Sequence, residues 1–183
     1  MSTNQILAEH VENYITHDDA IHGRLEDPYA DSPFKIYREM SSKTKGKYFE
    51  AFVEEYCENL GWKVERAKGT TEYDRIVNNY NVEVKGSTVW AGKKPHFRWQ
   101  QIRPEHCYDI MVFVAVYPDR MEFYSCTKEE IVDYVTNQNW LNQHGGKKAD
   151  SGTFYIDGFP EDFPFFKTLY THLSGFKGTI DEE

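Results

Sequence analysis

The sequence lacks several features that would assign a protein to a class at once. Its 183 residues contain no apolar run of about 18 residues, so no transmembrane helix is expected. The acidic N-terminus, MSTNQILAEHVENYITHDD, has no apolar stretch of the kind found in signal peptides, which favours a cytoplasmic protein. The motifs GxGxxG, GxxxxGK[ST], HExxH and GxSxG are absent, as are internal repeats, so no small-molecule cofactor is indicated.

Cysteine is also scarce. The three cysteines, Cys57, Cys107 and Cys126, are odd in number and show no Cys-x-x-Cys spacing. This pattern indicates neither a disulfide framework nor a zinc-binding module.

The chain does contain enough apolar residues to build a core. Hydrophobic residues make up 39% of the sequence and aromatic residues 16%, which excludes a wholly disordered chain. The net charge of −9 argues at first against a nucleic-acid partner. The charge is uneven, however, because residues 1–42 and 104–183 are acidic whereas residues 43–103 hold 12 basic and 8 acidic residues. A basic middle third fits a local site for a polyanion.

Helical spacing of apolar residues occurs in two stretches before the first predicted strand. Residues 4–15 place Ile6, Leu7, Val11, Tyr14 and Ile15 on one stripe. A second helix is predicted over residues 45–62, and Gly61 follows its last periodic residue as a helix stop should.

Strand patterns follow the second helix. Residues 62–67 alternate, and residues 73–77 and 80–87 predict a hairpin around the polar turn NNYN. Residues 108–118 form a near-continuous apolar run, which predicts a central strand buried on both faces. Residues 120–126 predict its hairpin partner or an edge strand. A helix over residues 127–141 is expected to start with a capping box of Thr127 and Glu130, and a long loop then enters a short strand.

This order of elements predicts one α/β domain. We expect an N-terminal helical extension over residues 1–42, a core over residues 43–135 and a C-terminal extension over residues 136–183 that packs on the core.

Three charged residues of the predicted hairpin suggest chemistry. Glu83 and Lys85 point to the same face of a strand, and Asp74 comes from its neighbour, while Val82 and Val84 face the core. Two carboxylates suit Mg²⁺, which prefers oxygen ligands, and a nearby lysine can position or deprotonate water. The competing interpretation is a solvated ion pair on an edge strand, which would contribute little.

The pattern Asp-x8-Glu-x-Lys, with a helix before it and a glutamine after it, resembles the PD-(D/E)xK nuclease superfamily over residues 43–126. The resemblance implies a restriction-endonuclease-like core, with a central mixed β-sheet flanked by helices. It implies Asp74, Glu83 and Lys85 as catalytic residues, with Glu50 on the preceding helix and Gln101 after the lysine. Glu54 and Gln100 are the alternatives to these last two, and Glu50, Glu54 and Glu58 also fit an ordinary solvated helix face.

The same resemblance implies a metal cofactor, Mg²⁺ with Mn²⁺ as a substitute. Its ligands would be Asp74, Glu83, Glu50 and the main-chain carbonyl of Val84.

Basic residues around this pattern are candidates for nucleic-acid contacts. Phe97 and Trp99 alternate with Arg98, and we expect these two aromatic residues to pack in the core. The candidate contacts are Lys45, Lys93, Lys94, Arg98, Arg103, Lys147 and Lys148.

Three functional hypotheses remain open. The first is a Mg²⁺-dependent endonuclease that cuts DNA, of type II restriction-like kind and working as a homodimer, because cutting two strands needs two sites. The second is a repair, recombination or phage nuclease acting on branched or single-stranded DNA. The third is a non-catalytic nuclease-fold protein that binds a partner or mimics DNA, which the net charge favours and the Asp-Glu-Lys set opposes.

Overall fold

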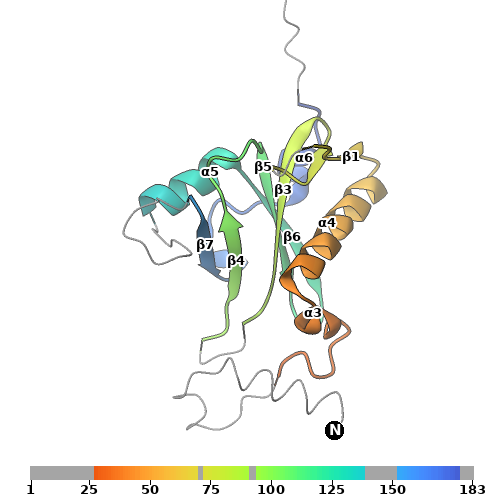
Figure 1. Ribbon diagram of the computed structural model, residues 1–183, viewed down its shortest axis with the longest axis vertical. Coiled ribbons are helices and arrows are strands. Elements are labelled where there is room, and N and C mark those ends of the chain that lie inside the picture. Colours follow the sequence, from red (N-terminus) through yellow and green to blue (C-terminus); the bar gives the residue numbers. More distant parts are fainter. Residues whose placement is uncertain (1–26, 70–71, 91–93, 139–151, 178–183) are drawn as a thin grey trace, which may run out of the picture.

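The most apolar run of the sequence forms the central strand. In the computed structural model, which describes residues 27–69, 72–90, 94–138 and 152–177, β5 (Ile110–Val116) is buried along its whole length. It lies in a five-stranded sheet ordered β1-β2-β3-β5-β6 (Figure 1). β5 pairs in parallel with β3 (Tyr80–Thr88) and antiparallel with β6 (Met121–Thr127). The predicted buried strand and its hairpin partner at the sheet edge are therefore confirmed.

The other end of the sheet is built from a short meander. β1 (Val64–Arg66) and β2 (Arg75–Val77) are antiparallel to each other, and β2 is antiparallel to β3. The predicted hairpin is confirmed, but its turn has two residues instead of the four in NNYN. Asn78 and Asn79 both have positive φ, 49° and 69°, and such a turn matches the twist of the flanking strands.

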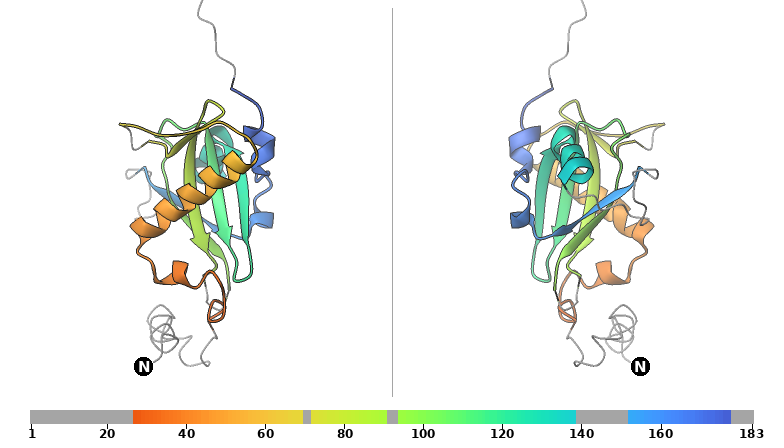
Figure 2. Two further views of the ribbon diagram at one scale, coloured as in Figure 1. Left: turned by 90° about the vertical axis from the view of Figure 1, so that its right-hand side faces the viewer. Right: turned by 90° about the vertical axis from the view of Figure 1, so that its left-hand side faces the viewer.

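One long helix covers one face of the sheet. α4 (Ser42–Asn59) starts at Ser41, whose side chain accepts a hydrogen bond from the Thr44 amide, and Gly61 follows its end with φ of 77°. It buries Phe49, Val53 and Cys57 and crosses the sheet diagonally (Figure 2), and short α3 (Ile36–Glu39) precedes it. The predicted helix over residues 45–62 is thus confirmed with slightly earlier bounds.

The opposite face carries α5 and a second small sheet (Figure 2). α5 (Lys128–Asp133) has the predicted capping box of Thr127 and Glu130, but it is shorter than expected and continues as a π-helix, Tyr134–Gln138. β4 (Phe97–Ile102) and β7 (Phe154–Gly158) form an antiparallel pair. Phe97 and Trp99 are fully buried, as predicted from their alternation with Arg98.

The segment after β7 packs against this core. It contains a 3-10 turn, Pro160–Asp162, and α6 (Leu169–Leu173). Phe163 and Phe166 lie against Trp99, at ring distances of 6.1 and 5.7 Å. The expected mixed α/β fold, with a central mixed sheet flanked by helices, is therefore present.

Two expectations are not settled by these elements. The helix predicted over residues 4–15 lies outside the described residues, and the division at residues 42 and 135 stays a prediction. Within the described ranges, no helix is long and apolar enough to cross a membrane.

Candidate functional site

The site is built where β2 stops and β3 continues. β2 pairs with β3 only as far as Arg75 opposite Val82, while β3 runs on to Thr88. Asp74 stands just before β2, and its Oδ2 accepts a hydrogen bond of 2.8 Å from the Val84 amide. Because the N–H and C=O of an extended residue point to the same side of a strand, the Val84 carbonyl faces the same open edge as Asp74.

Glu83 and Lys85 share one face of β3, as predicted. The Lys85 Nζ lies 2.5 Å from Glu83 Oε1, and Glu83 is 7% exposed. The other oxygen, Oε2, is buried and accepts no hydrogen bond from any described residue. Burial raises the pKa of Glu83 to about 7, Lys85 opposes this rise, and the Asp74 carboxylate adds to it. The fold therefore leaves a buried carboxylate half satisfied beside a second acid.

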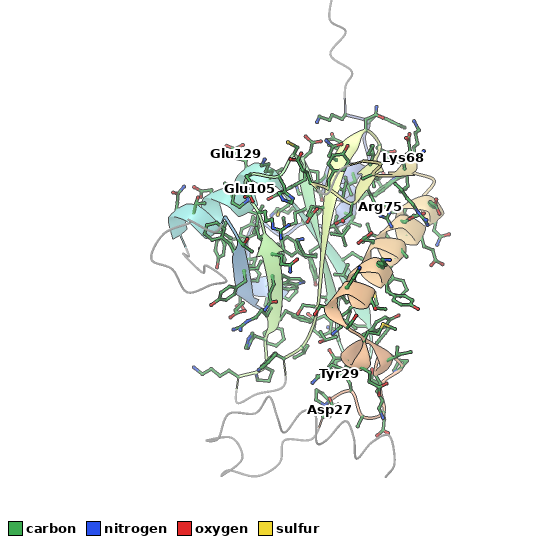
Figure 3. All side chains as sticks on the ribbon, viewed as in Figure 1. Asp27, Tyr29, Lys68, Arg75, Glu105 and Glu129 are labelled. Carbon is green, nitrogen blue, oxygen red and sulfur yellow. The ribbon has the colours of Figure 1, made fainter. Side chains whose placement is uncertain are left out.

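Glu50 approaches the same acids from α4 but has a partner of its own. Arg75 is 7% exposed and lies beside α4 (Figure 3). Its Nη1 donates to Glu50 Oε2 at 3.0 Å and to the Asp74 carbonyl at 2.8 Å. Burial and the nearby Asp74 raise the pKa of Glu50, whereas Arg75 lowers it. Glu50 is thus near the two acids yet already ion-paired.

Sequence reasoning missed Arg75. Its Nε also donates to Glu54 Oε2 at 2.9 Å, and Glu54 receives further hydrogen bonds from Arg66. Glu54, the alternative to Glu50, is therefore committed to two arginines. The sequence does contain an indication of this contact: Glu50 and Glu54 lie one turn apart on α4, and Arg75, the basic residue after Asp74, can reach both.

A groove of about 360 Å³ adjoins Lys85 between the start of α4, β3 and β4. Gln101, the predicted glutamine, lines it together with Gln100, and both are exposed. Gln101 has a φ of 60° and lies where the β4–β7 register shifts between Trp99 and Ile102. This bulge places two consecutive side chains outside the core.

The candidate nucleic-acid contacts fall in different environments. Lys45 is half-buried and lines the groove, Lys94 is exposed, and Arg103 is half-buried. Arg98 also lines the groove, but Asp157 binds its guanidinium through both oxygens, at 2.7 and 2.6 Å. Lys93, Lys147 and Lys148 lie outside the described residues.

The oxygen donors fit a magnesium ion better than a zinc ion. Among the described residues, no cluster of three or more His, Cys, Asp or Glu side chains could hold a metal. Mg²⁺ does not need such a cluster, because it is often bound through one or two carboxylates and keeps several waters. Asp74, the unpartnered Oε2 of Glu83 and the Val84 carbonyl supply donors of this type.

Comparison with known proteins finds a similar fold among solved structures. No protein-family model and no curated protein matches this sequence. The solved structure of a bacterial homing endonuclease, I-Ssp6803I, is similar with a TM-score of 0.50 and 17% sequence identity. The match covers 73% of this chain and 92% of that chain. At this identity the likeness concerns the fold: the arrangement of sheet and helices is one that an endonuclease uses.

Proposed function

We propose that this protein is a Mg²⁺-dependent endonuclease of the PD-(D/E)xK type that hydrolyses DNA phosphodiester bonds. One observation carries the proposal: Asp74, Glu83 and Lys85 meet at the open edge of β3, where Glu83 Oε2 is buried without a hydrogen-bond partner among the described residues. Four other buried polar atoms also lack a hydrogen-bond partner among the described residues, but Glu83 Oε2 belongs to an acid that lies beside a second carboxylate and a lysine. The fold likeness to a homing endonuclease supports the same conclusion.

The residues that would hold the metal are Asp74, Glu83 and the Val84 carbonyl. Bound Mg²⁺, or Mn²⁺ in its place, would lower the pKa of a coordinated water and stabilise charge that develops on the phosphate. Asp74 is already oriented by the Val84 amide, so this carboxylate needs little rearrangement. Glu50 lies close enough to Asp74 for the two carboxylates to affect each other. It would influence the metal site through Asp74 and not as a ligand, because Arg75 already binds its carboxylate.

Lys85 would position or deprotonate the attacking water. Its ammonium now contacts Glu83, so it is on the correct face and within reach of the acids. A lysine that shares a carboxylate with a metal site can direct a water toward the phosphorus and offset the charge of the transition state. Gln101 lies across the groove from β3 and would help to hold the substrate or the water.

The kind of endonuclease we propose is one that cuts both strands of a duplex as a homodimer, in the manner of type II restriction enzymes. Cutting two strands at one place requires two sites, and a symmetric dimer provides them. The alternative is a repair, recombination or phage nuclease that acts on branched or single-stranded DNA. The exposed Trp90 in the groove beside Lys85 favours that alternative, because exposed aromatic rings can stack on unpaired bases. The cluster of Asp74, Glu83 and Lys85 argues against the third hypothesis, a non-catalytic role.

The test is cleavage of plasmid and short synthetic DNA in Mg²⁺ or Mn²⁺ by the native chain and by Lys85→Ala. Lys63→Ala is a matched control, because Lys63 is an exposed lysine paired with Glu65. We expect the native chain and the control to cut, and Lys85→Ala to lose at least about a hundredfold in rate. Undiminished cleavage by Lys85→Ala would refute the site assignment.

The products separate the kinds of nuclease. Discrete bands from plasmid would support the restriction-like proposal, whereas cutting only at junctions or flaps would support the repair alternative. Binding without cleavage of any substrate would support the non-catalytic hypothesis.

A further inference from the structure

The groove beside Lys85 has a charge character opposite to that of the acidic site. Lys45, Lys85 and Arg98 line it, and none of the described residues that line it carries a carboxylate. The carboxylates of Asp74 and Glu83 lie just beyond its Lys85 end. Lys85 and Arg98 are already paired with Glu83 and Asp157, which leaves Lys45 as the cation for a phosphate backbone that leads toward a metal-bound phosphate at the Lys85 end.

Lys45 is the least satisfied cation of the groove. It is half-buried on the second turn of α4, and no carboxylate of a described residue pairs with it. Burial lowers its pKa, and the neighbouring Arg38 lowers it further. A half-buried cation near another cation is stabilised by an anion from outside, and a phosphate in the groove would provide one.

Trp90 adds an aromatic surface to the same groove. It is 42% exposed, whereas Phe97 and Trp99 on the adjoining strand are fully buried. Its amide donates to the His96 carbonyl at 2.7 Å, so its backbone is held in place. Exposed aromatic side chains beside a cationic groove are the usual platforms on which unpaired bases stack.

Gln100 and Gln101 complete the lining opposite β3. In a regular strand one of two consecutive residues would point into the core, but the bulge in β4 leaves both exposed. Each amide carries donors and acceptors that can pair with the edge of a base. These edges are accessible only when the base is outside the duplex stack or presented in a groove.

The size of the groove limits what can enter. Its volume of about 360 Å³ is at the lower end of small-ligand pockets. A single nucleotide has the appropriate size.

We propose that this groove takes one unstacked nucleotide next to the phosphate that is cut, so that DNA with an unpaired nucleotide there is preferred over intact duplex. Lys45 contacts the backbone phosphate, Trp90 stacks on the base, and Gln100 and Gln101 contact the base edge. The proposal rests on the alternative form of the proposed function, a nuclease that acts on branched or single-stranded DNA, for the position of the cut, but the groove and its lining can be tested by binding alone.

The experiment measures binding to fluorescent DNA in EDTA, where no cleavage occurs. Three probes of equal length are compared: a perfect duplex, the same duplex with one bulged 2-aminopurine nucleotide, and a single strand. We expect the native chain to bind the bulged duplex and the single strand on the order of tenfold more tightly than the perfect duplex. The 2-aminopurine fluorescence should change on binding as the base leaves the helix and stacks on Trp90.

Matched variants assign the effect to the groove. Trp90→Ala should lose about tenfold in affinity for the bulged probe, and Trp90→Phe should keep most of it, because both aromatic rings can stack. Lys45→Gln should lower the slope of log affinity against log salt by about one on every probe. Tyr170→Ala is the control, because Tyr170 is 65% exposed but does not line the groove.

Two outcomes would overturn the proposal: equal affinity for the perfect and bulged duplexes, or unchanged binding by Trp90→Ala. A parallel cleavage assay in Mg²⁺ separates this failure from failure of the proposed function. Cleavage without any preference for an unpaired nucleotide would refute the groove proposal and leave the nuclease intact. Binding with the expected preference but no cleavage in Mg²⁺ or Mn²⁺ would refute the nuclease and leave the groove proposal intact.

Discussion

Two polar regions flank the buried strand β5, and the fold treats them differently. On the β6 side, Ser125 is fully buried, but its hydroxyl donates to the Thr168 carbonyl at 2.9 Å and lies 2.8 Å from His172 Nδ1. On the β3 side, Glu83 is almost as buried, yet its Oε2 has no hydrogen-bond partner among the described residues. Ser125 and its partners hold α6 against the sheet. Around Glu83, burial and the nearby Asp74 disfavour the charged carboxylate, and Lys85 offsets this only in part.

The difference shows how a structural polar site can be told from a functional one. Buried polar groups that serve only the fold are normally satisfied, since each one left unpaired costs stability. Groups with perturbed pKa values and incomplete pairing gather at functional sites. We therefore expect changes on the β6 side to alter stability, and changes at Glu83 to alter stability and function in opposite directions.

The largest effect on stability is expected in the aromatic cluster that Trp99 of β4 forms with Phe113, Phe163 and Phe166. Trp99→Ala removes a fully buried side chain whose Nε1 donates to the Val114 carbonyl at 3.2 Å. We expect a loss of about 4 kcal/mol in the free energy of unfolding, from the cavity and the lost hydrogen bond, measured by urea titration. Tyr170→Ala, at an exposed aromatic residue, should change it by less than about 1 kcal/mol. A similar loss in both variants would contradict the proposed importance of this cluster.

The next effect tests the packing that holds α4 beside the site. A Cβ on Gly86 would lie 1.9 Å from Phe49 Cδ2, so Gly86→Ala forces the helix away from β3. We expect a loss of about 3 kcal/mol, at the upper end of the cost of overpacking, from thermal unfolding.

The Gly86→Ala effect has an internal control. Gly46 on α4 has open space where a Cβ would lie, so Gly46→Ala should stabilise the protein by about 1 kcal/mol. Adding Phe49→Leu to Gly86→Ala should recover part of the loss. If the double variant is no more stable than Gly86→Ala, the clash is not the cause.

A third prediction uses the pKa of Glu83, which burial raises to about 7. Because the folded protein holds this proton more tightly than the unfolded chain, the stability that Glu83 contributes is present below pH 4.5 and is lost as pH rises through about 7. Glu83→Gln, which cannot ionise, should therefore be more stable than the native chain by about 3 kcal/mol at pH 8, because one pKa unit corresponds to about 1.4 kcal/mol and the value of about 7 already includes the opposing Lys85 contact.

The measurement for Glu83→Gln is thermal unfolding without metal at pH 8 and pH 5, with binding of Mn²⁺ measured separately. The stability gain should shrink at pH 5, and metal binding should be lost at both values. Glu65→Gln, at an exposed acid, should change neither property. A variant that is less stable at pH 8 and still binds metal would show that Glu83 is a structural residue.

The smallest effect concerns His172 on the structural side. Burial lowers its pKa, Glu130 opposes this change, and Lys167 adds to it. The folded protein thus prefers the neutral ring, so its contribution to stability is present above pH 6.5 and is lost as the pH falls below that value. We expect the free energy of unfolding of His172→Gln to fall less than that of the native chain between pH 8 and pH 5. Urea titration at each pH measures this difference. An unchanged curve would show that His172 does not couple α6 to protonation.

Much of the fold was predictable because its signals are local. The apolar run of β5, the periodic face of α4 and the capping box of α5 each depend on neighbouring residues, and all three are confirmed. The predicted four-residue turn and the predicted helix over residues 127–141 were wrong in length. Both lengths depend on how the chain is twisted and packed at that point.

The candidate site was predictable only in part. The shared face of Glu83 and Lys85 follows from strand alternation, and the structure places Asp74 next to them. Arg75 was missed, and with it the ion pair that ties up Glu50. Arg98 was predicted to contact nucleic acid. Its bidentate contact with Asp157 was not predicted, because the two residues are 59 positions apart in the sequence.

The sequence by itself determined the order of the elements and which residues of β3 share a face, because both follow from backbone periodicity over a few residues. Only the tertiary structure decided which charges are already paired and which are not. Pairing depends on which distant segments meet: Arg75 reaches Glu50 on α4, and Asp157 on β7 reaches Arg98. It also decided that Glu83 is buried with one oxygen that no residue in the described part of the chain pairs, since burial is set by everything packed around it.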